Sequence, residues 1–312
     1  MSDNTIQRWG EKPYYSLDFY LKETFGQKIY KLALDAGMTC PNRDGSLSYT
    51  GCFYCSEGGS GDFASDSSLP IAAQLSEARR RLSSKTDCRK FIAYFQAFTN
   101  TYAPVEYLEK IFYEAISDPS VCVLSIGTRT DCFNDEIYDL LSRLNNIKPV
   151  WIELGLQSIH QSTLDAMNTH TKVSDFTVVC NELNKRSIKV IAHLILGLPG
   201  ETKEMMLESV DFAAKSNIFG IKLQLLHVLR NTKLAELYEK DPFPLFSLEE
   251  YCDFIVDCIE RLPPGMVIHR MTGDGPRKLL IAPMWSTDKK RVLNTINQNF
   301  IKRNTYQGRF FM

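Results

Sequence analysis

The sequence lacks the long apolar runs that a membrane-spanning segment requires. None of its hydrophobic stretches reaches the ~18 residues needed to cross a bilayer. Residues 1–16 (MSDNTIQRWGEKPYYS) contain no apolar core of a signal peptide. The sequence also shows neither an internal repeat nor a low-complexity linker. We therefore expect a cytoplasmic protein with no membrane association, in which most of the chain shares one large core.

An excess of charge of one sign is also missing, because 36 Lys and Arg oppose 37 Asp and Glu. This balance hides an asymmetry. Residues 277–312 contain eight bases and one acid, so this end carries +7 and the rest of the chain −8. A basic end on an acidic body is typical of a surface that meets a polyanion. A solvated helix face is the alternative, and the charge pattern alone leaves both open.

Paired cysteines are scarce, since only one Cys-x2-Cys occurs among nine cysteines. Without a signal peptide, this number indicates reduced thiols and not a disulfide framework. The pair Cys52 and Cys55 follows Cys40 by a loop in which Gly45 and Gly51 favour turns. Five of the remaining cysteines have no paired spacing and are expected to be small buried hydrophobes: Cys88, Cys122, Cys180, Cys252 and Cys258.

Three thiolates are one short of the four that close a zinc site or a fully ligated iron–sulfur cluster. A four-iron cluster held by Cys40, Cys52 and Cys55 therefore keeps one iron open for a substrate or cofactor. A zinc site completed by a distant histidine is the alternative, although zinc sites usually show a second paired motif. Free core cysteines are another alternative.

The stretch CPNRDGSLSYTGCFYC (residues 40–55) resembles the signature of the radical S-adenosylmethionine (SAM) enzymes. The wider match resembles the YhcC/YtqA-type subgroup, related to the Elongator catalytic subunit and the oxygen-independent coproporphyrinogen oxidases. The segments AYFQAFTNT, APMWS and RNTYQG are more similar to the YtqA-type branch. This resemblance implies one 4Fe-4S cluster whose open iron binds SAM, and reductive cleavage of SAM to a radical that abstracts hydrogen from substrate.

Strand-like and helix-like segments alternate along the chain, which favours an α/β fold with a parallel sheet. Residues 28–37, 91–96, 121–127, 150–158, 189–197 and 220–228 read as strands. Most are apolar on both faces, as in a sheet covered by helices. Six right-handed β/α units predict a partial (β/α)6 TIM-like barrel, as the resemblance also implies. Catalytic groups then gather at the carboxyl ends of the strands.

The domain organisation is predicted from the alternation of strand-like and helix-like segments, which changes after Pro242. Residues 1–24 form an N-terminal extension and residues 25–235 the partial barrel. Residues 236–312 form a C-terminal α/β extension packed on the barrel, basic from about residue 277. Ser247 and Glu250 have the spacing of a capping box at the start of a helix in this extension.

Several cofactor contacts are predicted at strand ends. The resemblance places a Gly-Gly-Glu motif for the SAM amino group where this chain has YFQAFTNT, so the contact is expected from Gln96, Thr99 or Asn100. An ordinary polar strand end is the alternative. The motif ELGLQS resembles one whose Glu and Gln contact SAM, which carries over to Glu153 and Gln157. The motif HLILGLPGET resembles one that lies along adenine, which implicates Ile195 and Gly197.

Glu153 lies in an apolar strand, so its carboxylate needs a partner, expected to be the SAM ammonium or Arg129. Arg129 could instead bind a substrate carboxylate or phosphate, or form an ion pair with Asp131. Cys132 is a candidate hydrogen donor. Lys222 indicates a polar barrel lumen and is the third catalytic candidate.

Three histidines complete the set of candidates. His227 ends the sixth strand and is a further cofactor-binding candidate. His193 faces inward and is expected to be either a satisfied core histidine or a proton-transfer group. His269 is a plausible substrate contact, together with the neighbouring Arg270.

The resemblance to the YtqA-type branch implies work on tRNA. There, the carboxymethylaminomethyl group of a wobble uridine is converted to aminomethyl, and the basic end would suit this polyanion. A reductant such as flavodoxin or ferredoxin is implied as a partner. Two alternatives remain: radical chemistry on a small metabolite or porphyrin, and a non-catalytic iron–sulfur or zinc protein.

Overall fold

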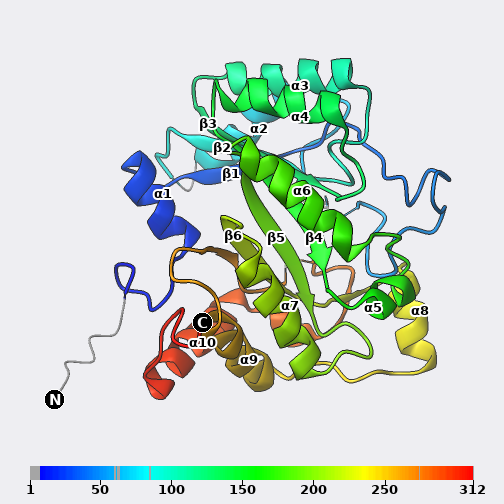
Figure 1. Cartoon of the computed structure of the whole chain (residues 1–312), viewed down its shortest axis with the longest axis vertical. Coiled ribbons are helices and arrows are strands. Elements are labelled where there is room, and N and C mark those ends of the chain that lie inside the picture. The colour runs from blue at the N-terminus through cyan, green and yellow to red at the C-terminus, as the bar shows by residue number, and fades with distance from the viewer. Residues whose placement is uncertain (1–7, 60, 62–63, 84–85, 274, 312) are drawn as a thin grey trace.

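A curled sheet of seven parallel strands forms the centre of the computed structural model, in the order β1-β2-β3-β4-β5-β6-β8 (Figure 1). The structure describes residues 8–59, 61, 64–83, 86–273 and 275–311. Parts of the predicted N-terminal extension and of the glycine-rich segment 56–63 therefore lie outside the described residues. The strands are β1 Tyr30–Leu34, β2 Phe91–Phe95, β3 Val121–Thr128, β4 Val150–Gln157, β5 Lys189–Leu196, β6 Gly220–Leu225 and β8 Val267–Arg270.

Helices α2 to α7 occupy the crossovers between the strands and cover the outer face of the sheet. Their apolar residues form the main core with the outward-facing strand residues. The side chains of Asn134 and Thr202 cap α4 and α7 by accepting backbone hydrogen bonds, and the predicted capping box of Ser247 and Glu250 is confirmed at the start of α9. The helices are α1 Leu17–Phe25, α2 Ile71–Ser83, α3 Val105–Ser117, α4 Asp135–Asn145, α5 Gln161–Ala166, α6 Val173–Lys185, α7 Lys203–Lys215, α8 Lys233–Lys240, α9 Leu248–Glu260 and α10 Lys289–Arg303.

The partial barrel is confirmed, and the C-terminal extension adds a strand to it. β8 pairs in parallel with β6, and the backbone of Ile268 in β8 also bridges to Ser16 before α1. The sixth strand is shorter than predicted. The chain leaves the sheet after Leu225, and β7 (Val228–Leu229) pairs antiparallel with β9 (Leu280–Ala282), which the 3-10 helix Met284–Thr287 follows.

Aromatic and aliphatic side chains close the barrel at the amino ends of the strands. Trp151 and Ile191 point inward there and pack with Leu21 of α1. Tyr20 and Phe219 contact the indole ring, with ring centroids 6.0 and 5.3 Å away. Because all seven strands are parallel, the opposite edge collects every carboxyl end and the loops that follow them.

Candidate active site

The cysteine loop follows β1 and therefore lies at the carboxyl edge. Its chain reverses tightly, since the amide of Cys55 donates to the carbonyl of Cys52 at 3.0 Å. Gly45 and Gly51 have φ values of +95° and +75°, the left-handed region that glycine adopts most readily. The predicted turn chemistry of the loop is thus confirmed.

Cys52 and Cys55 lie in direct contact. The hydrogen bond with Cys55 and the charge of Arg129 lower the pKa of Cys52 to about 6. The hydrogen bond with Cys52, together with burial, raises the pKa of Cys55. The charge of Cys40 also raises the pKa of Cys55. Among the described residues, no three His, Cys, Asp or Glu side chains are grouped closely enough to hold a metal ion. Ligation of one cluster by all three thiols stays a prediction.

Arg43 holds the cysteine loop through backbone carbonyls, a role that was not predicted from the sequence. Its guanidinium donates to the carbonyls of Cys55 at 3.1 Å and Ser56 at 2.7 Å. It also lies 5.6 Å from the ring centroid of Phe98. A Cβ on Gly51 would come within 2.8 Å of the Arg43 Nε. The NRDG sequence indicated only a turn, so nothing local identified this contact.

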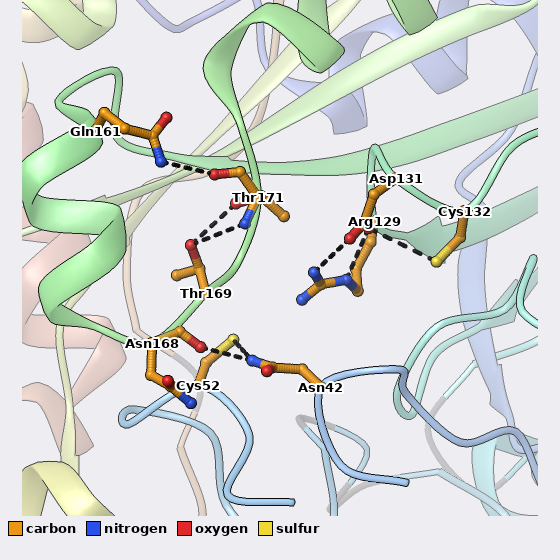
Figure 2. Close-up of polar contacts among 9 residues, drawn as sticks. All are labelled: Asn42, Cys52, Arg129, Asp131, Cys132, Gln161, Asn168, Thr169 and Thr171. Carbon is orange, nitrogen blue, oxygen red and sulfur yellow. Dashed lines mark hydrogen bonds and ion pairs between the residues drawn. The ribbon is translucent and has the colours of Figure 1, made fainter. Parts of the chain in front are cut away.

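The segment after α5 supports the same loop from a distant part of the chain (Figure 2). The amide of Asn42 donates to Cys52 Sγ at 3.4 Å and to the carbonyl of Asn168 at 2.6 Å. In return, the Asn168 side chain donates to the carbonyl of Gly51 at 2.9 Å. Asn168 has a φ of +54°, a conformation that asparagine tolerates better than most residues. No local sequence signal in this segment indicates such a role.

Arg129 faces the cysteines but is already paired. Its guanidinium makes two hydrogen bonds to the Asp131 carboxylate, at 2.9 and 2.7 Å (Figure 2). Although burial acts in the opposite direction, Asp131 raises the pKa of Arg129 above its ordinary value. The alternative of an Arg129–Asp131 ion pair is therefore the one observed.

Cys132 lies in a pocket of about 450 Å³ beside this ion pair. The pocket is bounded by the loops after β2 and β3, and Asp131 is among its lining residues. The Cys132 Sγ lies 3.6 Å from the Asp131 carboxylate, and burial raises the pKa of the thiol. Its role as a hydrogen donor stays a prediction.

The backbone after β2 takes a conformation that the sequence did not reveal. Ala97 and Phe98 have φ values of +91° and +58°, within the stretch YFQAFTNT where the resemblance expects a Gly-Gly-Glu motif. Non-glycine residues in this region carry strain, which concentrates at functional sites. The buried Asn100 amide donates to the carbonyls of Ala97 and Gly127 and stabilises the turn. Thr99 is buried and its amide donates to the carbonyl of Thr39, while Gln96 is partly exposed.

Gln157, Ile195 and Gly197 end β4 and β5 at the same edge and are partly exposed. Gln157 has a φ of +64° and Gly197 one of +93°. The position of a Cβ on Gly197 faces Phe246 at 3.3 Å. His227 lies against Gly273 and Gly275, and its Nδ1 accepts from the amide of Gly275 at 3.1 Å.

Glu153 does not pair with Arg129, contrary to one of the two expected partnerships. It lies deeper in the lumen and accepts hydrogen bonds from Lys31 at 2.5 Å and Ser125 at 2.8 Å, and contacts His193 at 2.8 Å. It also forms a salt bridge with Lys222, which confirms the polar lumen. Burial raises the pKa of Glu153, but the charges of Lys222 and Lys31 outweigh it and hold the pKa well below its usual value. The carboxylate is thus satisfied without SAM.

His269 is not placed for substrate contact. It follows Ile268 near the amino end of β6 and lies edge-on to Trp151 and Phe219, with centroids 5.6 and 5.7 Å away. This cluster closes the far end of the barrel from the cysteines. The residues of β8 were predicted to belong to an extension packed on the barrel, and their incorporation into the sheet explains the difference.

Buried side-chain oxygens without a hydrogen-bond partner provide a test of whether a cofactor fits here. Within the described part of the chain, four such atoms belong to residues of this edge or its loops: Asn42 Oδ1, Asn100 Oδ1, Thr130 Oγ1 and Gln157 Oε1. Buried acceptors of this kind normally have partners. SAM carries an ammonium group, ribose hydroxyls and an adenine amine, so its donors suit them. Its contacts to the candidate residues remain a prediction.

Comparison with known proteins agrees with this arrangement. The model of the Radical SAM superfamily matches residues 40–213, and that of the Radical_SAM C-terminal domain matches residues 218–302. The chain is 42% identical to the uncharacterized protein YtqA of Bacillus subtilis (strain 168) over 301 residues, 96% of this chain and 94% of YtqA. It is 33% identical to YhcC of Escherichia coli (strain K12) over 270 residues, 86% of each chain.

A solved structure shows the same fold at low sequence identity. Elp3 of the archaeon Methanocaldococcus infernus, with residues 1–46 deleted, superposes with a TM-score of 0.68 at 18% identity. The match covers 89% of this chain and 64% of that chain. The higher identity to YtqA than to YhcC agrees with the predicted branch.

Proposed function

The chain belongs to the radical SAM superfamily, and membership implies a 4Fe-4S cluster and SAM. We propose that Cys40, Cys52 and Cys55 hold this cluster and that the enzyme modifies tRNA. When bound, the cluster and SAM supply reductive SAM cleavage and hydrogen-atom abstraction. The proposed substrate is the carboxymethylaminomethyl group of a wobble uridine, and the proposed product is its aminomethyl form. Flavodoxin or ferredoxin is the proposed electron source.

Other residues of this chain would position the cysteine loop and SAM for the reaction. Arg43 and Asn42 keep the cysteine loop in place through the contacts described above. The unpartnered oxygens of Asn100 and Gln157 would accept hydrogen bonds from SAM and orient it. The base of aromatic residues around Trp151 closes the barrel and keeps water from entering at the amino ends of the strands.

The observation that supports tRNA as substrate is a group of exposed cations, Arg230, Arg277 and Lys278. The amide of Leu234 donates to the carbonyl of Phe53, and that of Arg230 to the carbonyl of Leu279. These two bonds join the loop to α8 and the residue Arg230 to Leu279, which directly follows Arg277 and Lys278 in the chain. All three cations are exposed, and none makes an ion pair within the described ranges. Such cations are suited to phosphates.

Reductive SAM cleavage with and without purified tRNA tests the proposal. We expect 5′-deoxyadenosine to form faster with tRNA from a deletion strain, and mass spectrometry of its nucleosides to show the aminomethyl product. Unchanged wobble uridines in the deletion strain would contradict the tRNA assignment and favour a small substrate. Protein that contains zinc and releases no 5′-deoxyadenosine would contradict the enzyme assignment.

A further inference from the structure

The barrel lumen is open to solvent from the carboxyl edge. Along β2 to β6, inward-facing residues near this edge are partly exposed, whereas their outward-facing neighbours are buried. The partly exposed positions are Gln96, Gly127, Gly155, Ile195 and Gln224. Two of the five are glycines, so a substrate group could pass this level and reach the layer of side chains beneath it.

That next layer is a polar floor, formed by inward side chains one step deeper on six strands: Lys31, Tyr94, Ser125, Glu153, His193 and Lys222. Glu153 is the acidic centre of this floor. Two ammonium groups lie over the Tyr94 ring, with Lys31 Nζ 4.5 Å and Lys222 Nζ 4.8 Å from its centroid. Lys31 and His193 remain 23% and 16% exposed, so the floor can be reached.

The floor holds more positive than negative charge. Two lysines face the single carboxylate of Glu153. Burial and the charge of Lys222 lower the pKa of His193 to about 4, so this ring is neutral near pH 7. Burial and the like charges of Lys31 and Arg270 lower the pKa of Lys222 to about 7, although Glu153 acts in the opposite direction. A second anion would compensate this excess, since buried charges require partners.

We propose that this floor binds the carboxylate of the substrate, with the partly exposed Lys31 as its direct partner and His193 beside it. The inference rests on the proposed function, because the carboxymethylaminomethyl group ends in a carboxylate. It replaces the earlier hypothesis for Arg129, whose charge Asp131 already compensates through two hydrogen bonds. Lys31 can be removed without leaving Glu153 unpaired, since Lys222 and His193 still contact it.

Two RNA hairpins, one with this carboxylate and one with it neutralised by a methyl group, test the inference. One carries the carboxymethylaminomethyl uridine and the other its neutral methyl ester, and binding to the cluster-loaded protein is measured anaerobically by fluorescence anisotropy. Lys31→Met and Arg129→Met are compared with Lys110→Met, the loss of an exposed lysine on α3. We expect the wild type and Lys110→Met to prefer the acid by about tenfold, as for a charged hydrogen bond worth about 1.4 kcal/mol.

In Lys31→Met the preference should fall below about threefold, and in Arg129→Met it should persist. Persistence in Lys31→Met with loss in Arg129→Met would overturn the inference and leave the proposed function standing. Absence of binding or turnover of either RNA would instead contradict the proposed function.

A probe without RNA separates the two questions. N-acetylglycine carries a short carboxylate, and N-acetylglycinamide is its neutral match. We expect the ¹⁵N signals of His193, assigned from their loss in His193→Asn, to shift with the acid only, and less in Lys31→Met. Such shifts would support the anion site even if the tRNA assignment fails. If the acid moves the His193 signals no more than the amide does, the inference is wrong whatever the RNA experiments show.

Discussion

Individual ionisable residues in the lumen are controlled by their neighbours more than by their own chemistry. Glu153 remains charged at full burial because lysines approach it from two strands, and His193 remains neutral beside it. Both shifts link protonation to folding, since each pKa differs from its unfolded value. The two groups act in different pH ranges and can be separated.

His193 should lower stability as the solution is acidified. The pKa of His193 is about 4 in the folded protein and 6.5 in the unfolded chain, where these neighbours are absent. As the pH falls, the unfolded chain therefore binds the proton before the folded protein does. The free energy of unfolding therefore falls as the pH drops from 6.5 towards 4, by at most about 1.4 kcal/mol per pH unit. Urea unfolding between pH 7.5 and 5 should show a shallower decline in His193→Gln. The exposed His170→Gln is the control, and an equal decline in both variants would contradict this assignment.

Binding of the proposed cluster depends on all three thiols of the cysteine loop. Cys55→Ala should lose the 4Fe-4S cluster and all detectable SAM cleavage, because two thiolates cannot replace three. Iron and sulfide content and 5′-deoxyadenosine after anaerobic reconstitution measure this. Cys88→Ala removes a thiol whose contacts are to Lys28 and Lys90, so it should retain the cluster. Full activity in Cys55→Ala would refute the site.

Arg43 should act as a positioning residue. Arg43→Met removes its bonds to the carbonyls of Cys55 and Ser56, and we expect cluster retention to fall about tenfold on gel filtration. The paramagnetic resonance spectrum of the remaining reduced cluster should broaden as the loop becomes heterogeneous. Arg43→Lys keeps one charge and should restore part of both. Unfolding in urea should change little, which distinguishes loop positioning from general destabilisation.

At the scale of elements, the C-terminal extension is tied to the start of the chain by buried polar contacts. Gln307 is fully buried, and its Oε1 accepts from the amide of Tyr15 at 2.8 Å. Its amide donates to the carbonyls of Pro263 and Met266 at 2.7 and 2.8 Å. The RNTYQG segment is thus explained by structure, since Gln307 joins the N-terminal segment to the residues that lead into β8.

Gln307→Leu should destabilise the protein by about 2–5 kcal/mol, because it leaves several buried backbone groups unpaired at about 1–3 kcal/mol each. The midpoint of urea unfolding measures the loss. Gln298→Leu on the exposed face of α10 is the matched control and should change the free energy of unfolding by less than about 0.5 kcal/mol. A similar small change in Gln307→Leu would show that these hydrogen bonds contribute little.

Across the whole molecule, the basic end does not form one continuous cationic surface. Arg303 on α10 is engaged by Asp257 and Glu260 of α9, and Arg291 lies 3.8 Å from Glu249. Arg277 and Lys278 are instead exposed, and the carbonyl of the adjacent Leu279 accepts from the amide of Arg230. The ion pairs of α10 favour a solvated helix face there, whereas a polyanion-binding surface at Arg277 and Lys278 remains a proposal. Of the helices described, none combines the length and apolar character needed to traverse a bilayer.

Arg277→Met with Lys278→Met should weaken tRNA binding and reduce its salt dependence. The plot of log affinity against log salt has a negative slope, and each lost phosphate contact makes it less steep by about 0.7–0.9. The double substitution should therefore reduce the steepness by roughly 1–2. Lys289→Met with Lys290→Met on α10 is the matched control and should leave the slope near that of the wild type. Equal effects of the two pairs would contradict the assigned surface.

Local sequence signals were sufficient wherever the responsible contacts are short in range. The turn glycines Gly45 and Gly51 and the capping box at Ser247 each act within a few residues, so they were predictable. The alternation of apolar segments likewise determined the parallel sheet and its outer helices, because burial on both faces requires it.

The tertiary structure alone decided which distant residues meet. The partners of Glu153 come from β1, β5 and β6, and those of Asn42 from the segment after α5. β8 has four residues, too few for periodicity to reveal that it enters the sheet. Pairings of this kind depend on strand register and side-chain approach across the barrel, and no spacing along one chain segment records them.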